Sequence, residues 1–209
     1  MLYLGLNFDS FDQKENAYHY PIIKIVSKPK SHIEKHLKDL SIFTHYIFTS
    51  PRSVDVFCDY LLNTDKLQLL KSKYIIAIGK TTQKGLISYN LHSIVPKVPT
   101  QEGIVELLNN IPLENSHFLI PRSSIARKEI DHFFKRKKIN YSPLDIYDTH
   151  INERLKEIDL NDFEEVFFTS PSTVRAFVKV FKNIPSHLKF KSIGPITERA
   201  IYCNLFKDI

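Results

Sequence analysis

The sequence predicts an α/β protein of two similar lobes, each with a parallel sheet flanked by helices. An internal repeat is the first indication: FTSPRSVDVF at 48–57 matches FTSPSTVRAF at 168–177, and AIGKTTQKGL at 77–86 matches SIGPITERAI at 192–201. The second indication is that short apolar strands alternate with helical patterns in both copies. The composition of the 209 residues, 43% hydrophobic and 25% charged, is globular and excludes a disordered or fibrous chain.

The first repeated segment predicts a strand followed directly by a helix. An apolar run, residues 46–49 or 166–169, leads into Ser-Pro. Ser50 and Ser170 suit the N-cap, and proline suits the first helical position, where no backbone N–H is needed. Apolar residues then recur at helical spacing, so each helix is expected to bury one face. These residues are Val54, Phe57, Cys58 and Leu61 in the first copy, and Val174, Phe177, Val178 and Phe181 in the second.

The second repeated segment predicts a strand that stops at glycine, Gly79 or Gly194, before another helix. Thr81 and Thr82 open the helix in the first copy, and Pro-Ile-Thr197 opens it in the second. The remaining elements lie between the copies. They are predicted as strands over 92–95 and 117–120, helices over 102–110 and 123–138, and an extended run after residue 139.

The second copy needs one further strand, which the N-terminal LYLGLN is placed to supply. The domains are then a discontinuous α/β lobe, a lobe inserted into it, and two proline-bearing linkers between them. We expect residues 1–24 plus 147–209 in the discontinuous lobe, 25–146 in the inserted lobe, and linkers near 20–26 and 142–149.

Charge and targeting signals narrow the class of protein. Twenty-nine Lys and Arg against 23 Asp and Glu leave a net charge of +6, which favours an acidic partner such as nucleic acid, phosphate or a polycarboxylate. The basic run 135–138 is more typical of a solvated helix end than of a ligand site. No apolar run is long enough for a bilayer, no signal peptide is evident, and two cysteines are too few for a disulfide framework. We expect a soluble, cytoplasmic protein without a membrane partner.

The repeated helix N-termini are candidate anion sites, since ligands of open α/β sheets bind beyond the carboxyl ends of the strands. PRSS at 121–124 predicts a further such terminus, where Arg122 offers a bidentate donor to a carboxylate. Serine and threonine also serve simply as caps at these positions, and that alternative stays open. The candidate substrate-binding residues are Ser50, Arg52, Ser53, Thr81, Thr82, Arg122, Ser123, Ser170, Ser172, Thr173 and Thr197.

Several familiar sites are absent from the sequence. It contains neither GxGxxG nor GxxxxGK[ST], so the common nucleotide phosphate loops are missing. His32 and His36 lie on a predicted surface helix without the HExxH pattern, and we expect no metal site. No GxSxG elbow or cysteine–histidine pair indicates acyl transfer.

Taken in order, the motifs FTSPRSV, AIGKTT, TQEGIVELL, FLIPRSSIARKEI, LDIYDT, FFTSPSTV and SIGPIT resemble the uroporphyrinogen-III synthase family. The resemblance runs from about Pro21 to Ala200. It implies two α/β lobes joined by a two-stranded linker, with the active site in the cleft between them. It also implies a reaction of tetrapyrrole (haem) biosynthesis, in which linear hydroxymethylbilane loses water and closes to a macrocycle with its fourth pyrrole ring inverted. No cofactor or metal takes part.

The resemblance assigns a catalytic role to Tyr147, which matches the family's tyrosine near the departing hydroxyl and would act as a weak general acid. A packed linker aromatic is the alternative. The chain departs from the family at Asn7, where arginine is common, in a shortened first helix, and after the Gly-Pro-x-Thr segment, where a strand and a helix are missing. All three departures fall in the discontinuous lobe.

Two other functions stay open beside the synthase. One is a non-catalytic, two-lobed small-molecule binding or regulatory protein derived from the same fold. The other is nucleic-acid binding through Arg127 to Lys138, which is disfavoured because Phe133 and Phe134 lie at core-facing helical spacing. We therefore expect a monomer that binds a small polycarboxylate substrate and no nucleic acid.

Overall fold

The computed structural model describes residues 1–9, 11–37 and 39–206. They divide into two compact units. Unit 1 takes the described residues of Met1–Ile25 and Thr149–Ile209, and unit 2 takes those of Val26–Asp148. The chain passes between the units in β3 (Ile23–Ser27) and β7 (Asn140–Ile151), which are neighbours in one sheet.

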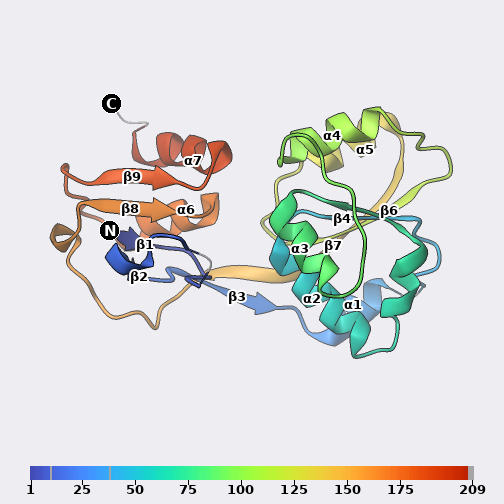
Figure 1. Ribbon diagram of the computed structural model, residues 1–209, viewed down its shortest axis with the longest axis horizontal. Helices are drawn as coiled ribbons and strands as arrows, with labels where there is room; N and C mark the ends of the chain where they lie inside the picture. Colours follow the sequence, from blue (N-terminus) through green and yellow to red (C-terminus); the bar gives the residue numbers. More distant parts are fainter. Residues whose placement is uncertain (10, 38, 207–209) are drawn as a thin grey trace. The chain divides into compact units, whose positions relative to one another are not determined.

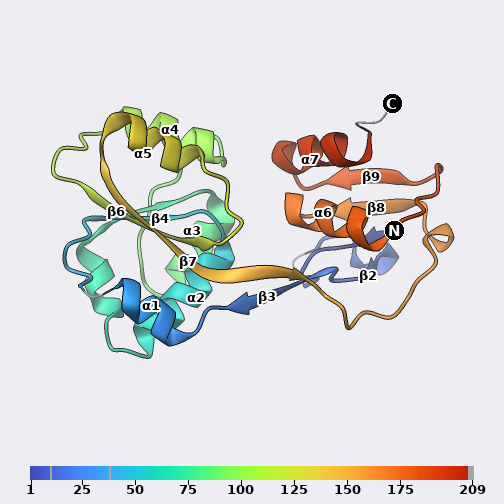
Figure 2. The same ribbon diagram turned by 180° about the vertical axis from the view of Figure 1, so that it is seen from behind.

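Unit 2 is built on a five-stranded sheet with the order β3-β7-β6-β4-β5 (Figures 1 and 2). The pairs β4–β5, β4–β6 and β6–β7 are parallel. Helices α2 and α3 pack together, as do α4 and α5. The other strands are β6 (His117–Ser123), β4 (His45–Phe48) and β5 (Tyr74–Ala77), and the helices are α1 (Lys30–His36), α2 (Pro51–Leu62), η2 (Leu67–Ser72), α3 (Lys80–Ile87), α4 (Gln101–Asn109) and α5 (Glu129–Lys137).

The two helix pairs cover opposite faces of the unit 2 sheet. Phe48 on β4 contacts Phe57 of α2, with ring centroids 6.0 Å apart. Its neighbour Ile47 points the other way and packs in a cluster with Ile104 of α4 and Phe133 of α5. Successive strand residues therefore pack into separate cores on the two faces of the sheet, which is the arrangement of a buried parallel sheet.

Unit 1 is smaller and repeats part of this design. Its four-stranded sheet has the order β2-β1-β8-β9, with parallel pairs throughout (Figure 1). Helices α6 and α7 pack together, and Phe177 of α6 meets Phe168 of β8. The elements are β1 (Leu2–Tyr3), η1 (Lys14–Asn16), β2 (Tyr18–His19), η3 (Leu160–Asp162), β8 (Glu165–Phe168), α6 (Pro171–Val180), β9 (Lys189–Ser192) and α7 (Pro195–Leu205).

Aromatic rings cover the other face of the unit 1 sheet. Tyr3 packs against both Phe11 and Phe167, with ring centroids 4.3 and 5.8 Å away. Phe8 stacks on His19 at 4.8 Å. Leu2 and Leu4 point away from this cluster into the core beneath α6 and α7.

The predicted fold class is confirmed as a mixed α/β fold with parallel sheets flanked by helices. Both repeated segments form the predicted strand and helix, and β1 pairs with β8 as β6 pairs with β4. The strand predicted over 92–95 was wrong, because only Ile94 forms a bridge, to Ile76.

The helix predicted over 123–138 was wrong at both ends, since α5 spans Glu129–Lys137. At its N-terminal side, β6 continues through Ser123. The backbone N–H of Ile125 then donates to the hydroxyl of Ser123, which closes a turn before the helix. At the other end, Lys138 takes a left-handed conformation with φ 56° and stops the helix.

Candidate functional site

The N-terminus of α2 is fixed by a serine pair. Ser50 is the N-cap, and its hydroxyl accepts a hydrogen bond from the Ser53 backbone N–H at 3.1 Å. The Ser53 hydroxyl donates to the Ser50 carbonyl at 2.7 Å. Ser53 is fully buried, so its side chain serves the cap and does not reach a ligand. Ser50 is only partly buried and has hydrogen-bonding capacity left.

Tyr147 uses that remaining capacity. Its phenol oxygen lies 3.0 Å from the Ser50 hydroxyl oxygen, and Ser123 is its partner on the neighbouring strand β6. The tyrosine is 6% exposed. Burial raises the pKa of the phenol above its ordinary value, while the Ser50 hydrogen bond, the positive charge of Arg52 and the Ser123 hydrogen bond oppose the rise. The structure thus brings together three residues that the sequence predicted for the site.

A β-bulge places Tyr147 at this position. Along β6 and β7, Arg122 is opposite Asp145, but the next residue, Ser123, is opposite Tyr147. Ile146 is therefore the extra residue of β7, and it is fully buried. The bulge turns Tyr147 toward Ser123 and the start of α2.

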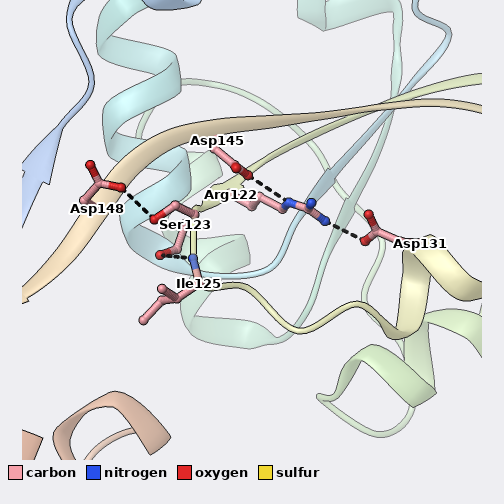
Figure 3. Close-up of polar contacts among 7 residues, drawn as sticks. Arg122, Ser123, Ile125, Asp131, Asp145 and Asp148 are labelled. Atoms are coloured by element: carbon pink, nitrogen blue, oxygen red, sulfur yellow. Dashed lines mark hydrogen bonds and ion pairs between the residues drawn. The ribbon is translucent and has the colours of Figure 1, made fainter. Parts of the chain in front are cut away.

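Arg122 has a different role from the predicted one. It is 4% exposed and pairs with two carboxylates: Asp131 of α5 at 2.5 Å and Asp145 of β7 at 3.1 Å (Figure 3). Its guanidinium is committed to these partners, and residues 121–124 do not begin a helix. Arg122 therefore ties α5 to the β6–β7 ladder and does not present a donor to a substrate carboxylate.

The turn after β6 is held by a second set of polar contacts around Asp148, of which Figure 3 draws the one from a serine hydroxyl. The Ser124 hydroxyl donates to one oxygen of Asp148 at 2.6 Å, and the Lys28 ammonium binds the other at 2.6 Å. The backbone N–H of Lys28 donates to the Ile146 carbonyl at 2.8 Å. These contacts hold the chain on both sides of Tyr147.

The start of α6 in unit 1 corresponds to the start of α2. It has the same kind of cap, but the cap hydroxyl has a different hydrogen-bond partner. Ser170 caps α6 and accepts from the Thr173 backbone N–H at 3.3 Å, and the buried Thr173 hydroxyl donates to the Ser170 carbonyl at 2.7 Å. The Ser170 hydroxyl is hydrogen-bonded to Ser172 at 2.8 Å. Both serines are partly buried, so unit 1 presents a pair of hydroxyls at this helix start.

The other predicted binding residues differ in how exposed their side chains are. Arg52 and Thr81 are exposed, and Arg52 lies 3.7 Å from Asp55 of the same helix. Thr82 and Thr197 are buried, at 2% and 3% exposure. Their side chains therefore belong to the packing of α3 and α7.

Sequence reasoning missed the residues that anchor the site. They are Asp131 and Asp145, which pair with Arg122, and Lys28 and Asp148, which hold the turn. Asp145 and Asp148 flank Tyr147 in the LDIYDT motif, and that was the available signal. Across the described ranges, no group of three or more histidine, cysteine, aspartate or glutamate side chains is arranged to hold a metal ion. No helix among the described residues combines the length and hydropathy of a membrane span.

Comparison with known proteins identifies relatives of the chain. It is 26% identical over 174 residues to the uroporphyrinogen-III synthase of Chlorobaculum parvum, covering 78% of this chain and 71% of that protein. The fold is similar to a mutant uroporphyrinogen III synthase of Thermus thermophilus, with a TM-score of 0.71 at 14% identity, and to a uroporphyrinogen-III synthetase of Helicobacter pylori, with 0.68 at 19%. Each alignment covers 96% of this chain and 86% of the solved one.

The family model described as uroporphyrinogen-III synthase HemD matches residues 12–208. The match includes both copies of the internal repeat and the Tyr147 segment. It therefore spans well over half of the sequence, and the chain belongs to the uroporphyrinogen-III synthase family.

Proposed function

We propose that this protein is a uroporphyrinogen-III synthase of haem biosynthesis. Its reaction is the closure of hydroxymethylbilane to a macrocycle with loss of water and inversion of the fourth pyrrole ring. The observation that carries the proposal is the family match over residues 12–208, which takes in both compact units. The hydrogen-bonded Tyr147 and Ser50 supply the acid that the first step calls for.

The reaction needs one proton donor and a binding site that holds the pyrrole rings in a fixed arrangement. The substrate hydroxyl leaves from a carbon that the adjacent pyrrole nitrogen activates, and a weak acid nearby assists its departure. Tyr147 takes this role: its pKa lies above the ordinary value, so the phenol is protonated at neutral pH. The terminal ring then attacks to form a spiro intermediate, which fragments and recloses. Positioning of the rings decides which carbon is attacked.

The carboxylate arms of the substrate are held by helix N-termini and the exposed or half-buried polar side chains at them. Backbone N–H groups at a helix start, together with the positive end of the helix dipole, favour anions. No neighbour lies within 4 Å of a Cβ placed on Gly194, so a ligand has access to the start of α7. The side chains that remain candidates are Ser50, Arg52, Thr81, Ser123, Ser170 and Ser172.

The finer architecture belongs to the same proposal. We propose a discontinuous lobe of residues 1–24 plus 147–209, an inserted lobe of residues 25–146, linkers near 20–26 and 142–149, and a cleft between the lobes as the place of reaction. The enzyme works as a monomer, without a cofactor or metal. The division of the chain into two compact units near residues 25 and 148 supports this reading.

Product analysis tests the proposal. Purified protein is supplied with hydroxymethylbilane made in situ, and the product is oxidised to uroporphyrin and separated by isomer. The proposal expects the type III isomer, whereas spontaneous closure gives type I. A product mixture equal to that of the protein-free control would overturn the synthase and leave a non-catalytic binding protein.

A further inference from the structure

We infer that Ser50 is a positioning residue for the acid Tyr147: its hydroxyl aims the phenol and then donates to the phenolate that remains when the proton has left. The inference rests on the proposed function, in which Tyr147 is the proton donor. For Ser50, this role takes the place of holding a substrate carboxylate, because the hydroxyl has only one hydrogen to donate.

The geometry leaves the Ser50 hydroxyl well placed for this task. Its oxygen accepts the Ser53 N–H at 3.1 Å, so one lone pair is in use, and the Tyr147 oxygen lies 3.0 Å away. A serine hydroxyl has a single hydrogen and two lone pairs, so the hydrogen can be directed to Tyr147. The backbone of Ser50 is held as well, because the Ser53 hydroxyl donates to its carbonyl. The donor is therefore fixed before the substrate arrives.

The proton transfer creates the need for such a donor. The O–H bond of Tyr147 breaks, its proton joins the departing hydroxyl, and the C–O bond of the substrate breaks to release water. The electron pair of the O–H bond stays on the phenol oxygen, while the substrate becomes an azafulvenium cation. The proton that ring closure later releases restores the phenol. Between these events a phenolate stands in a site that is 6% exposed, where water gives it little solvation.

Three groups oppose the cost of that buried anion. They are the hydroxyls of Ser50 and Ser123 and the positive charge of Arg52. Hydrogen bonds to a charged oxygen are stronger than those between neutral groups, so the Ser50 contact strengthens as the proton leaves. An interaction that strengthens in the transition state raises the rate of the chemical step.

The counterpart in unit 1 shows that the contact is not a by-product of the cap. Ser170 has the same place at the start of α6 and the same pair of cap hydrogen bonds. Its hydroxyl meets Ser172, not a tyrosine. Capping thus requires only the hydrogen bonds within the first turn of the helix. The contact between the Ser50 hydroxyl and Tyr147 is not needed for the cap.

Three variants and a double-mutant cycle test the inference. Ser50→Gly deletes the hydroxyl yet keeps a residue that N-caps well, and Ser50→Thr keeps a hydroxyl. We expect Ser50→Gly to lower kcat by about tenfold and Ser50→Thr to restore most of the loss. In a Tyr147→Phe background, Ser50→Gly should lower kcat no further, because the group it serves has lost its proton. Thr100→Ala, which removes the cap of α4 in the same unit, is the matched control for a lost cap.

The outcomes separate the inference from the proposed function. If wild type makes type III product but Ser50→Gly keeps its kcat, or lowers it equally in the Tyr147→Phe background, Ser50 does not act through Tyr147. A loss of kcat in Thr100→Ala as large as that in Ser50→Gly would assign the effect to stability and overturn the inference. A wild type that makes no type III product overturns the proposed function and this inference with it.

Discussion

The two units share one strand–helix design and differ in what surrounds it. In both, an apolar strand runs into a serine-capped helix, and the buried residue three positions after the cap, Ser53 or Thr173, donates to the cap carbonyl at 2.7 Å. Beyond this, the second face of the sheet is covered by α4 and α5 in unit 2 and by aromatic rings around Tyr3 in unit 1.

The difference between the units separates what belongs to the fold from what the proposed function uses. The cap is common to both units, so it belongs to the fold. In unit 2 alone, among the described residues, a cap hydroxyl meets a buried tyrosine, on a strand that the Arg122 ion pairs hold to its neighbour. Unit 1 offers the hydroxyls of Ser170 and Ser172 and the accessible start of α7. Under the proposed function, proton transfer belongs to unit 2, and each unit offers groups that suit a substrate carboxylate.

The largest loss of stability is expected when Arg122, in unit 2, is replaced. Arg122→Met leaves Asp131, whose side chain is 8% exposed, without its cation. Breaking a buried ion pair by deleting one partner typically costs about 3–5 kcal/mol. We expect a loss of that size in the free energy of unfolding, measured by urea denaturation followed by circular dichroism.

Lys191→Met in unit 1 is the matched control. Its ion pair with Glu165 spans β9 and β8, and the two side chains are 49% and 25% exposed. Exposed pairs contribute about 0–1 kcal/mol, so this variant should unfold close to wild type. Equal losses in the two variants would contradict the view that a buried charge network distinguishes the sheet of unit 2.

A smaller change in the free energy of unfolding is expected when the pH is lowered. The Arg127 guanidinium binds Glu102 through two hydrogen bonds, of 2.6 and 2.9 Å, and holds the pKa of that carboxyl at about 2. The pKa is lower in the folded chain than the ordinary 4.5, so this stabilisation is complete above about pH 4.5 and is lost as the pH falls toward 2. Because Glu102 is largely exposed, the contribution should stay below about 1 kcal/mol.

Glu102→Gln tests this with urea midpoints measured between neutral and acid pH. The difference from wild type should be greatest at neutral pH and vanish toward pH 2. Glu165→Gln in unit 1 should show the same sign and a smaller difference. The pKa of Glu165 is lowered by one hydrogen bond from Lys191 and by nearby positive charges, whereas Glu102 receives two hydrogen bonds from Arg127. A difference that grew toward acid pH would contradict the assignment of the low pKa to Glu102.

The repeat made most of the fold predictable. Its two copies predicted the strands and helices that carry Ser50 and Ser170, because N-caps, prolines and apolar spacing are local signals. The predictions of secondary structure fail where contacts between residues distant in the sequence determine the local conformation. The stretch 92–95 reads as a strand, but only Ile94 pairs, and 123–128 reads as helix, but hydroxyl bonds of Ser123 and Ser124 close a turn there.

The candidate site was predictable in part, for the same reason. The sequence named Tyr147, Ser50 and Ser123, which lie together in the structure, but it also offered Arg122 as a ligand for the substrate. The burial of Arg122 depends on Asp131 and Asp145, which lie 9 and 23 residues away in the sequence. The β-bulge at Ile146 that turns Tyr147 toward Ser123 likewise depends on how β6 and β7 pair. Neither follows from local patterns.

The turnover and product isomer of Tyr147→Phe test the central claim most directly. The variant keeps the ring and its packing but loses the proton. General acid catalysis contributes typically about 10²- to 10⁴-fold, and the pyrrole nitrogen already assists departure of the hydroxyl. We therefore expect turnover to fall by roughly ten- to a hundredfold, with the product still type III, because geometry decides which carbon is attacked. Full turnover in the variant would contradict the account and make Tyr147 a packing residue.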